Sequence, residues 1–438
     1  MLVEDYEVDA GGLVYTFTLR DGVTFHNGQD LSSADVVASL EAFGDLTPRG
    51  KRLFSFVKSL TAPDKRTVEL TLTSPSGLLL NILADRGAGV LPASIVEAAG
   101  DTPLEPDQII GTGPYKLEGW EPNVAITLAR FDDYKPAPAT FEGQGGEKIA
   151  YFDEIKIVPV PDAAARVAGL ESGQFDWAEI LPVDLYDRFK SDPRFKVSTV
   201  LAGMFTILFN SKDAPSSDPV FRRAILTGLD FESLGATQGP PDLWNSDPGM
   251  LASTEGLHSK DNTDPWGATD VNAAKNLIEQ SDYNGEELQL VTTSASPQTY
   301  NIALDLSNQL QAMGIKVKLE NVELSALQER RPQAKGWHII TARDRVVPTP
   351  DLYPWIACGN TYGGYCSQEM DGLLEQLFTA ADEGEIQQTL DEIQSLYFKD
   401  VPNIKVVESL DVNGYSVDVQ GYHEGASFPF FYNVWKRR

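Results

Sequence analysis

One segment, residues 287–341, constrains the fold more than any other part of this 438-residue sequence. Its apolar positions change between a period of two and a period of about 3.6, which predicts strand, helix, strand, helix and strand in succession. The predicted elements cover 288–292, 298–313, 315–319, 324–331 and 337–341. Strands separated by helices at this spacing favour a parallel α/β sheet with right-handed crossovers.

Two loops of this segment are the first candidates for a functional site, because parallel α/β sheets bind ligands beyond the carboxyl ends of their strands. These loops are residues 293–299 and 342–351. The second contains Arg343 and Arg345, and a guanidinium group at a strand end can hold a carboxylate or a phosphate through two parallel hydrogen bonds. The alternative is that both arginines form ordinary ion pairs with aspartates of the same solvated loop.

The rest of the chain is long enough for more than one lobe, because a single hydrophobic core stops growing at roughly 250–300 residues. Two or three lobes are therefore expected. Alternating residues predict strands near 13–19 and 67–73, and a serine-capped helix is expected at about 34–43. A Gly-Thr-Gly-Pro break at 111–114 precedes further predicted strands and a helix at 162–172.

The charge balance excludes several classes of partner. The chain has 35 lysines and arginines against 64 aspartates and glutamates, which gives a net charge of −29. Such a surface repels nucleic-acid phosphates and anionic lipid headgroups, so neither a nucleic-acid partner nor a membrane-surface role is expected. No apolar run reaches the ~18–20 residues that span a bilayer. Residues 1–12 lack an export signal, which, taken alone, would suggest a cytoplasmic protein.

The two cysteines, Cys358 and Cys366, lie close together in a stretch that contains several glycines. This spacing suits a small loop closed by a disulfide and therefore an oxidising compartment, with two free thiols as the alternative. A metal site would need further histidine or cysteine ligands, and none of the four histidines lies close in sequence. No metal is therefore expected.

Motifs of the common enzyme classes are missing. The 111–114 break lacks the lysine and the serine or threonine of a phosphate-binding loop. The sequence contains neither a Gly-x-Ser-x-Gly elbow nor a His-Glu-x-x-His helix. Asp153 and Glu154 could be the carboxylate pair of a glycoside hydrolase, but adjacent strand residues point to opposite faces. No catalytic residue and no cofactor are therefore expected.

Short segments spread along the whole chain carry a resemblance to one known group of proteins. They are residues 2–8, 15–28, 34–37, 110–115, 162–166, 170, 172–173, 176, 209–210, 222–224 and 400–402. In this order they resemble the extracellular solute-binding proteins of family 5, the peptide/nickel/opine group. The resemblance covers essentially the whole chain, but it does not specify a ligand.

The resemblance implies a periplasmic-binding-protein-like fold of type II, an α/β clamp of three lobes that closes about a hinge. Residues 1–110 would form a variable, mostly β insertion lobe. Residues 111–196 with 412–438 would form the first α/β lobe, and residues 197–411 the second, which carries the Arg345 loop and the cysteine loop. Family members begin with an export signal and an opening stretch that precede residue 2 here, so the N-terminal part of the first lobe is expected to be missing.

The implied function is that of the substrate-binding subunit of an ABC importer. A monomer would capture a small-molecule solute in the cleft between its lobes, in the periplasm or outside the cell. Its closed form would then deliver the solute to permease subunits driven by an ATPase. The preferred ligand is anionic or sugar-like, such as an opine or a sugar phosphate, and a short peptide is the alternative. A secreted carbohydrate-active enzyme is the alternative of a different class.

The resemblance also points to ligand-binding positions. Dipeptide-binding members hold the peptide amine with an aspartate in the loop after the strand that matches 337–341, and here that position falls at or next to Arg345. Their arginine for the peptide carboxylate matches Tyr300 and Asn301. Both peptide-binding charges are therefore missing, and Arg345 followed by Pro348 is more similar to members with an arginine and a proline-containing turn there.

Large aromatic side chains near the candidate loops could cover a ring of the solute, since binding pockets favour aromatic linings with few polar anchors. The alternative is that these aromatics belong to the hydrophobic core. The candidates are Tyr300, Trp244, Trp355, Tyr365 and Phe205.

Overall fold

A computed structural model describes residues 2–139, 145–359, 362–423 and 429–437. The N-terminal lobe, residues 2–110, is built on an antiparallel sheet in the order β1-β2-β4-β3. The strands are β1 (Val3–Val8), β2 (Val14–Leu19), β3 (Val57–Thr61) and β4 (Thr67–Leu72). Every second side chain of β2 and β4 is buried, as expected for a sheet with one face on the core.

Helices pack on this sheet and on one another. They are α1 (Ser33–Leu46), α2 (Pro48–Phe54), α3 (Leu79–Leu83) and α4 (Ala93–Ala99). More of the lobe lies in helices than in strands, so the expectation of a mostly β lobe is corrected. The reason is physical: a single four-stranded sheet with one apolar face needs another layer to bury it.

The first α/β lobe contains a three-stranded antiparallel sheet and two helices. The sheet has the order β5-β6-β7, and a two-stranded sheet pairs β15 with β16. The elements are β5 (Tyr115–Glu121), β6 (Ala125–Arg130), β7 (Glu154–Ile157), α5 (Ala163–Ser172), β8 (Trp177–Leu181), α6 (Tyr186–Ser191), β15 (Val419–Gln420) and β16 (Trp435–Lys436). Asp162 caps α5 by accepting a hydrogen bond from Ala165 N, and Gly173 ends it with a φ of 76°.

The second α/β lobe is built on the largest sheet, in the order β10-β14-β9-β13-β11-β12. β11 pairs in parallel with both β12 and β13, which confirms the predicted parallel sheet. The strands are β9 (Phe195–Phe209), β10 (Trp244–Asn245), β11 (Glu287–Thr292), β12 (Lys316–Asn321), β13 (Ile339–Asp344) and β14 (Asn403–Ser416).

Seven helices pack around this sheet. They are α7 (Pro219–Gly228), α8 (Phe231–Ala236), α9 (Val271–Glu279), α10 (Pro297–Ala312), α11 (Leu324–Gln333), α12 (Gln368–Thr379) and α13 (Glu383–Asp400). Short 3₁₀ turns lie at Arg86–Ala88, Pro106–Gln108, Val183–Leu185, Pro241–Leu243 and Pro350–Leu352. The crossover helices α10 and α11 were both predicted from sequence.

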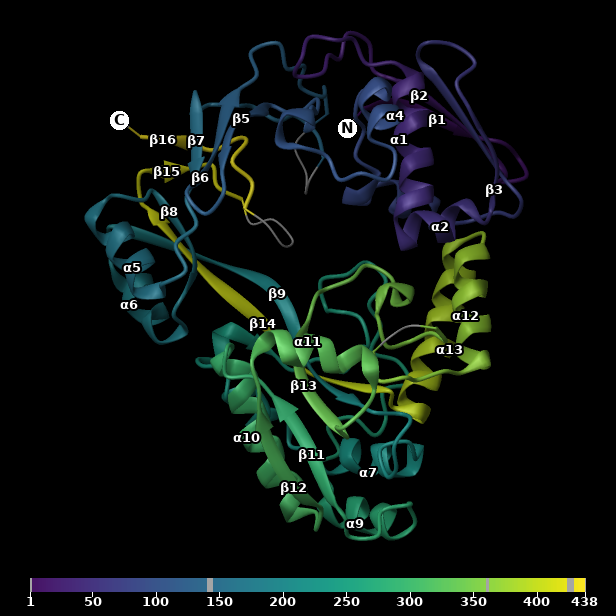
Figure 1. The fold of residues 1–438 in the computed structure, drawn as a ribbon, viewed down its shortest axis with the longest axis vertical. Coiled ribbons are helices and arrows are strands. Elements are labelled where there is room, and N and C mark those ends of the chain that lie inside the picture. The colour runs from purple at the N-terminus through teal and green to yellow at the C-terminus, as the bar shows by residue number, and fades with distance from the viewer. Residues whose placement is uncertain (1, 140–144, 360–361, 424–428, 438) are drawn as a thin grey trace.

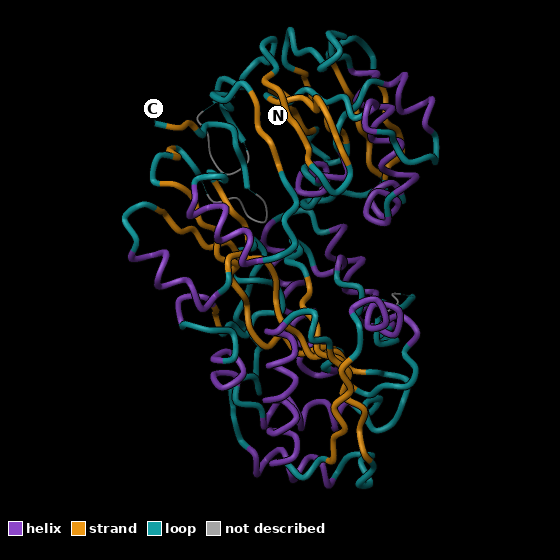
Figure 2. The backbone as a smooth tube through the Cα atoms, turned by 60° about the vertical axis from the view of Figure 1, so that its left-hand side comes forward, coloured by secondary structure: helices purple, strands orange, loops and turns teal. Residues whose placement is uncertain are grey.

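Two long strands join the α/β lobes. β9 and β14 pair antiparallel from Leu208 and Asn403 at one end to Phe195 and Ser416 at the other. Their far ends carry β8 in the first lobe, while β9 also pairs with β13 in the second. Figures 1 and 2 show these strands passing from one lobe into the other. They are the covalent connection about which the lobes can move.

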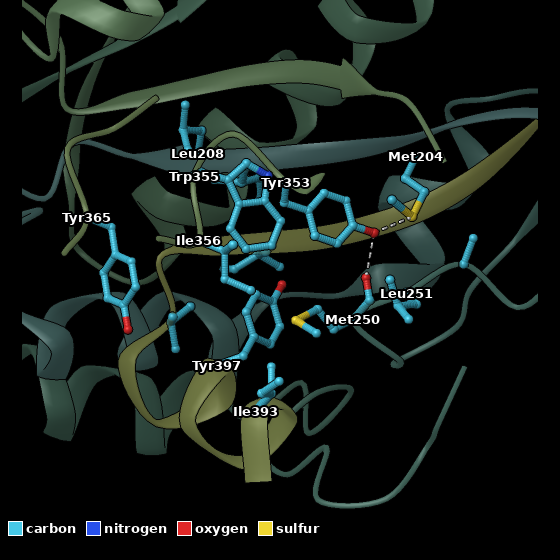
Figure 3. Packing of buried hydrophobic residues seen from close by; sticks show 14 of the residues in the cluster. Met204, Leu208, Met250, Leu251, Tyr353, Trp355, Ile356, Tyr365, Ile393 and Tyr397 are labelled. Atoms are coloured by element: carbon cyan, nitrogen blue, oxygen red, sulfur yellow. Dashed lines mark hydrogen bonds between the residues drawn. The ribbon is translucent and has the colours of Figure 1, made fainter. Parts of the chain in front are cut away.

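The largest hydrophobic core fills the second lobe and continues into the N-terminal lobe, while the first α/β lobe has small cores of its own. Figure 3 shows the aromatic part of the large core, where the Trp355 ring stacks on Tyr353 with 4.6 Å between centroids. The Tyr353 hydroxyl donates a hydrogen bond of 3.0 Å to Met250 O. A buried hydroxyl needs such a partner, so this contact fixes the 250 segment against the core.

Candidate functional site

The strand directions decide where the candidate loops lie. β9 enters the second lobe from the first, and β13 runs antiparallel to it, with Asp344 paired to Met204. The carboxyl end of β13 therefore points back toward the first lobe, and so does that of β11, which is parallel to β13. Both loops predicted from sequence, 293–299 and 342–351, thus leave the sheet on the side that faces the first lobe.

Three consecutive residues end β13 and begin its loop. Asp344 is buried, and its carboxylate accepts hydrogen bonds from Arg331 Nη2 at 2.6 Å and from Thr206 Oγ1 at 2.9 Å. Both oxygens of Asp344 are therefore used inside the lobe. This pairing fixes the end of the strand and leaves neither oxygen of Asp344 for the arginines on either side of it.

Arg343 reaches across the joining strands. Its Nη2 donates to Asp411 Oδ1 of β14 at 2.8 Å, and its guanidinium carbon lies 5.6 Å from the centre of the Phe205 ring. Gly203 makes room for this side chain, because a Cβ there would lie 3.1 Å from Arg343 Cγ and 2.7 Å from Asp344 O. Arg343 thus forms an ion pair, but with Asp411 of another strand and not with an aspartate of its own loop, which was the expected alternative.

Arg345 is exposed at the start of the loop. It makes no hydrogen bond and no ion pair with any residue that the structure describes. The aspartate beside it is already occupied by Arg331. An exposed guanidinium at the carboxyl end of a parallel strand, with no internal partner, is available to an anion from outside.

Glu179 of β8, in the first lobe, interacts electrostatically with Asp411, the ion-pair partner of Arg343. Glu179 is exposed at the surface, but desolvation by the surrounding protein raises its pKa, the charge of Asp411 raises it further, and the charge of Arg166 lowers it. Arg166 itself is held by the backbone, since it donates to Val160 O at 2.8 Å and to Ile180 O at 2.8 Å. Asp411 thus interacts with Glu179 of the first lobe and with Arg343 of the second, and we call these three residues the charge cluster.

The backbone beside Glu179 is unusual. Ile180 has a φ of 52°, a conformation that a β-branched residue rarely adopts. Its N–H donates to Asn413 Oδ1 at 3.2 Å, at the bulge where β8 pairs with β14. A bulge redirects side chains at the edge of a sheet, and here it turns the strand immediately after Glu179.

The structure does not bring the predicted aromatic residues together around this cluster. Phe205, Trp355 and Tyr365 are buried in the large core, and the Tyr365 hydroxyl donates to Asp400 Oδ2 at 2.7 Å. The alternative interpretation, core packing, thus describes these three in this structure. Figure 3 shows Trp355 and Tyr365 among core side chains.

Trp244 and Tyr300 are only partly buried. The Trp244 indole lies against α8, where a Cβ on Gly235 would come within 2.4 Å of the ring, and its Nε1 donates to Gly239 O at 3.3 Å. Trp244 is thus held by packing and by its polar atom. Tyr300 lies in the first turn of α10, directly after the 293–299 loop, which keeps it a candidate for solute contact.

Sequence reasoning missed Asp411, Glu179 and Gly203. Asp411 had no clear signal, because the stretch 403–416 also contains Lys405 and Glu408. Glu179 stands in a short apolar run. Gly203 had no signal of its own, since its role appears only when β13 is paired beside β9.

Other features add no second centre of this kind. A hollow of about 390 Å³ lies beside the carboxyl end of α5, and one of about 520 Å³ lies along α13. Neither is lined by the charge cluster or by Arg345.

Among the described residues no group of histidine, cysteine, aspartate and glutamate could hold a metal ion. Across the same ranges, no helix has both the length and the apolar character needed to span a bilayer.

The cysteine loop is closed as expected. Cys358 and Cys366 form a disulfide, which confirms the pairing predicted from their spacing. Cys358 N also donates to Asp371 Oδ1 of α12 at 2.9 Å. The disulfide thus ties the segment after the Arg345 loop to the start of α12.

Comparison with known proteins decides the family. The model of the bacterial extracellular solute-binding proteins, family 5 Middle, matches residues 1–364. The chain belongs to this family. It has the type II periplasmic-binding-protein fold, a three-lobed clamp, and it is the substrate-binding subunit of an ABC importer. Family members are extracellular or periplasmic transport receptors and not enzymes.

Curated relatives of family 5 match nearly the whole chain. A probable peptide ABC transporter periplasmic-binding protein of Sinorhizobium fredii is 26% identical over 456 residues, 99% of this chain and 85% of the relative. The oligopeptide-binding protein AppA of Bacillus subtilis is 26% identical over 434 residues, 92% of this chain and 76% of the relative.

Solved structures show the same fold. The binding protein AgaA of Agrobacterium tumefaciens R10, in complex with agropinic acid, superposes with a TM-score of 0.78 at 24% identity. That match covers 100% of this chain and 89% of AgaA. AppA of Bacillus subtilis, in complex with a nonapeptide, gives a TM-score of 0.80 at 22% identity and covers 100% and 90% of the two chains.

Proposed function

We propose that this receptor binds a small solute with a carboxylate or phosphate group, and that Arg345 is the anchor of that group. The observation that supports this most directly is the unpaired, exposed Arg345 guanidinium at the carboxyl end of β13. Arg345 has no ion pair among the described residues, although acidic residues outnumber basic ones by 64 to 35 in this chain. It suits a planar, bidentate anion.

The charge cluster supports the rest of the ligand chemistry. Glu179 and Asp411 supply carboxylates from two strands, and Arg343 neutralises one of them. Carboxylates accept hydrogen bonds from hydroxyl or ammonium groups, so a solute with an anionic end and a hydroxyl- or amine-bearing end fits both parts. Opines and sugar phosphates have this composition, and Tyr300 would cover the solute from the 293–299 side.

A short peptide is the second candidate. A peptide also carries a carboxylate and an ammonium group, and the names of two curated relatives state peptide or oligopeptide binding. The two candidates differ in where the amine is held. For a peptide, the carboxylates of Glu179 and Asp411 would have to take over the amine from the position that Arg345 now occupies.

The transport cycle follows from the clamp. Solute that bridges the lobes favours the closed form only by its greater affinity for that form. We infer that the protein acts as a monomer and that its closed form docks on permease subunits driven by an ATPase. The solute leaves unaltered, and no carbohydrate-active chemistry is involved.

Mass spectrometry tests this function. The purified protein is denatured, and the released small molecules are identified and then titrated back by calorimetry. We expect one anionic species in about equimolar amount that binds again and is recovered unchanged. A cationic solute would contradict the proposed role of Arg345, and chemical conversion of the added compound would contradict the receptor function.

A further inference from the structure

The N-terminal lobe and the second α/β lobe touch directly along a contact that we call the lobe seam. It consists of α2, Phe56 and Gly77 on one side, and of residues 349–352, the end of α12 and the turn between α12 and α13 on the other. Gly77 N donates to Ala380 O at 2.7 Å, and the Phe56 and Phe378 rings stack with 6.1 Å between centroids. Figure 1 shows α2 lying against α12 at this side of the molecule.

The N-terminal lobe presents positive charge to the seam. Residues 46–63 contain two arginines and two lysines and no acidic residue, in a strongly acidic chain. Arg49 and Arg52 are three positions apart on α2, so they share one face of the helix. The guanidinium carbon of Arg52 lies 4.7 Å from the centre of the Phe378 ring, which places this face on the second lobe.

Both arginines are incompletely paired. Arg49 Nη1 donates to Asp85 Oδ2 at 2.5 Å, within the N-terminal lobe. The Nε and Nη2 atoms of Arg49 and of Arg52 are buried and have no hydrogen-bond partner among the described residues. Only 7% of the Arg49 surface is exposed. Buried donors without a partner are costly, especially on charged groups.

The opposite side of the seam carries the complementary charge. Asp351 lies in the 3₁₀ turn at Pro350–Leu352, and its Oδ1 is likewise buried without a partner in the described part of the chain. Burial raises the pKa of Asp351, and the charges of Arg49 and Arg52 act in the opposite direction. An acidic group and two guanidinium groups thus face one seam, and each of them has at least one buried polar atom without a partner among the described residues.

We propose that Asp351 and the arginines Arg49 and Arg52 form a latch that positions the N-terminal lobe on the second lobe in the closed form. A small shift of the lobes pairs the Asp351 carboxylate with the free guanidinium nitrogens, whereas separation of the lobes hydrates all three groups. The latch is therefore a determinant of closure and not of solute contact.

The position of Asp351 connects the latch to the solute. The loop after β13 begins with Arg345 and reaches Asp351 six residues later. A solute held by Arg345 would order one end of this loop and thereby its other end in the seam. The coupling to the solute rests on the proposed function. The pairing across the lobe seam does not, so it can be tested in protein without solute.

The test measures the distance across the seam in solute-free protein. Spin labels are attached at the exposed positions Lys65 and Gln388, both changed to cysteine with the native disulfide kept, and the distance distribution is recorded by pulsed electron resonance. Asp351→Asn and Arg52→Gln are each expected to lower the ratio of short to long distances by about tenfold, because removing one partner leaves a buried charge unpaired. In the double variant this ratio is expected to be no lower than in either single variant.

Matched controls change charge without touching the latch. Lys51→Gln removes an exposed charge from the same helix, and Glu369→Gln removes an exposed one from α12. Both should leave the distribution unchanged. The exchanged pair Arg52→Asp with Asp351→Arg should restore the short distance, which separates pairing from a general loss of structure.

Two results would overturn the latch. One is an unchanged distribution in Asp351→Asn and Arg52→Gln. The other is a double variant whose effect equals the product of the two single effects, because independent residues behave in that way. If either of these two results is obtained with variants that still release their solute into the mass spectrometer, the latch fails while the proposed function stands.

Discussion

The three consecutive residues Arg343, Asp344 and Arg345, at the end of β13, have three different environments. Alternation along β13 sends Asp344 inward to Arg331, while Arg343 crosses to Asp411 and Arg345 stays exposed. Spacing in the sequence predicted that arginines stand at a strand end. It did not distinguish the paired arginine from the free one, because the partner Asp411 is 68 positions away and meets Arg343 only through the strand order.

Arg345→Ala should weaken binding of the solute recovered from the protein by more than about tenfold, or about 1.4 kcal/mol, because a charge-assisted hydrogen bond is lost. Isothermal calorimetry measures the dissociation constant. Lys335→Ala is the matched control, since Lys335 is exposed before the opposite end of β13. An unchanged constant in Arg345→Ala would remove this residue from the site.

Gly203→Val should reduce both solute binding and stability. The new side chain would begin 2.7 Å from Asp344 O and 3.1 Å from Arg343 Cγ, so either the strand or the arginine must move. Forcing extra atoms into a packed site typically costs about 1–3 kcal/mol. Chemical denaturation measures the stability change, and Gly119→Val is the control, because its Cβ would meet nothing within 4 Å.

Acid should destabilise the second lobe through Asp247. Burial raises the pKa of Asp247, but the charge of Lys405 and hydrogen bonds from His258, Lys260 and Lys405 outweigh it and lower the pKa to about 2. The folded pKa lies below the ordinary value of 3.8, so the folded state binds this proton less readily. The stabilisation is complete well above pH 4 and is lost as the pH falls toward 2.

Asp247→Asn should therefore flatten the dependence of unfolding free energy on pH between about 5 and 2, by about 2 kcal/mol. Urea denaturation at a series of pH values measures this. The variant also leaves Lys405 short of a partner, so its stability at pH 7 should fall. Asp184→Asn changes an exposed aspartate and serves as the control; equal slopes in both variants would contradict the assignment.

At the scale of elements, the sequence predicted what depends on local periodicity. The strands and helices from β11 to β13 were expected in the right order, because each shows one period along its whole length. β9 was not predicted. Its outer half is partly exposed and its inner half is continuously buried, since it passes from one lobe into another. No single period describes a strand with two environments.

The cysteine loop was also predictable, because two cysteines close in sequence determine it. Reduction, or Cys358→Ser with Cys366→Ser, should lower the free energy of unfolding by about 2–3 kcal/mol, the loop-closure entropy expected for a short loop. Denaturation with and without reductant measures the loss. Stability that does not respond to reductant would show that the disulfide constrains nothing in the unfolded chain.

At the scale of the whole molecule, the family resemblance and the structure explain different aspects of the function. The family supplies solute capture between lobes. The structure supplies the reason that capture can be coupled to movement: charges from β8, β13 and β14 meet where β9 and β14 join the lobes. The lobe arrangement could not be predicted from local patterns, because the residues at the lobe contacts, such as Gly77 and Ala380, are about 300 positions apart.

Solute binding should therefore close and stabilise the whole protein at once. A ligand present at about 100 times its dissociation constant stabilises the folded state by about 2.7 kcal/mol. The melting temperature should rise, and the radius of gyration from X-ray scattering should fall at the same solute concentrations, because both report occupancy of one closed form. In Arg345→Ala both curves should shift together to higher concentrations. A rise in melting temperature without any change in the radius would mean that the solute binds within one lobe, and the strands β9 and β14 would then be a rigid support instead of a hinge.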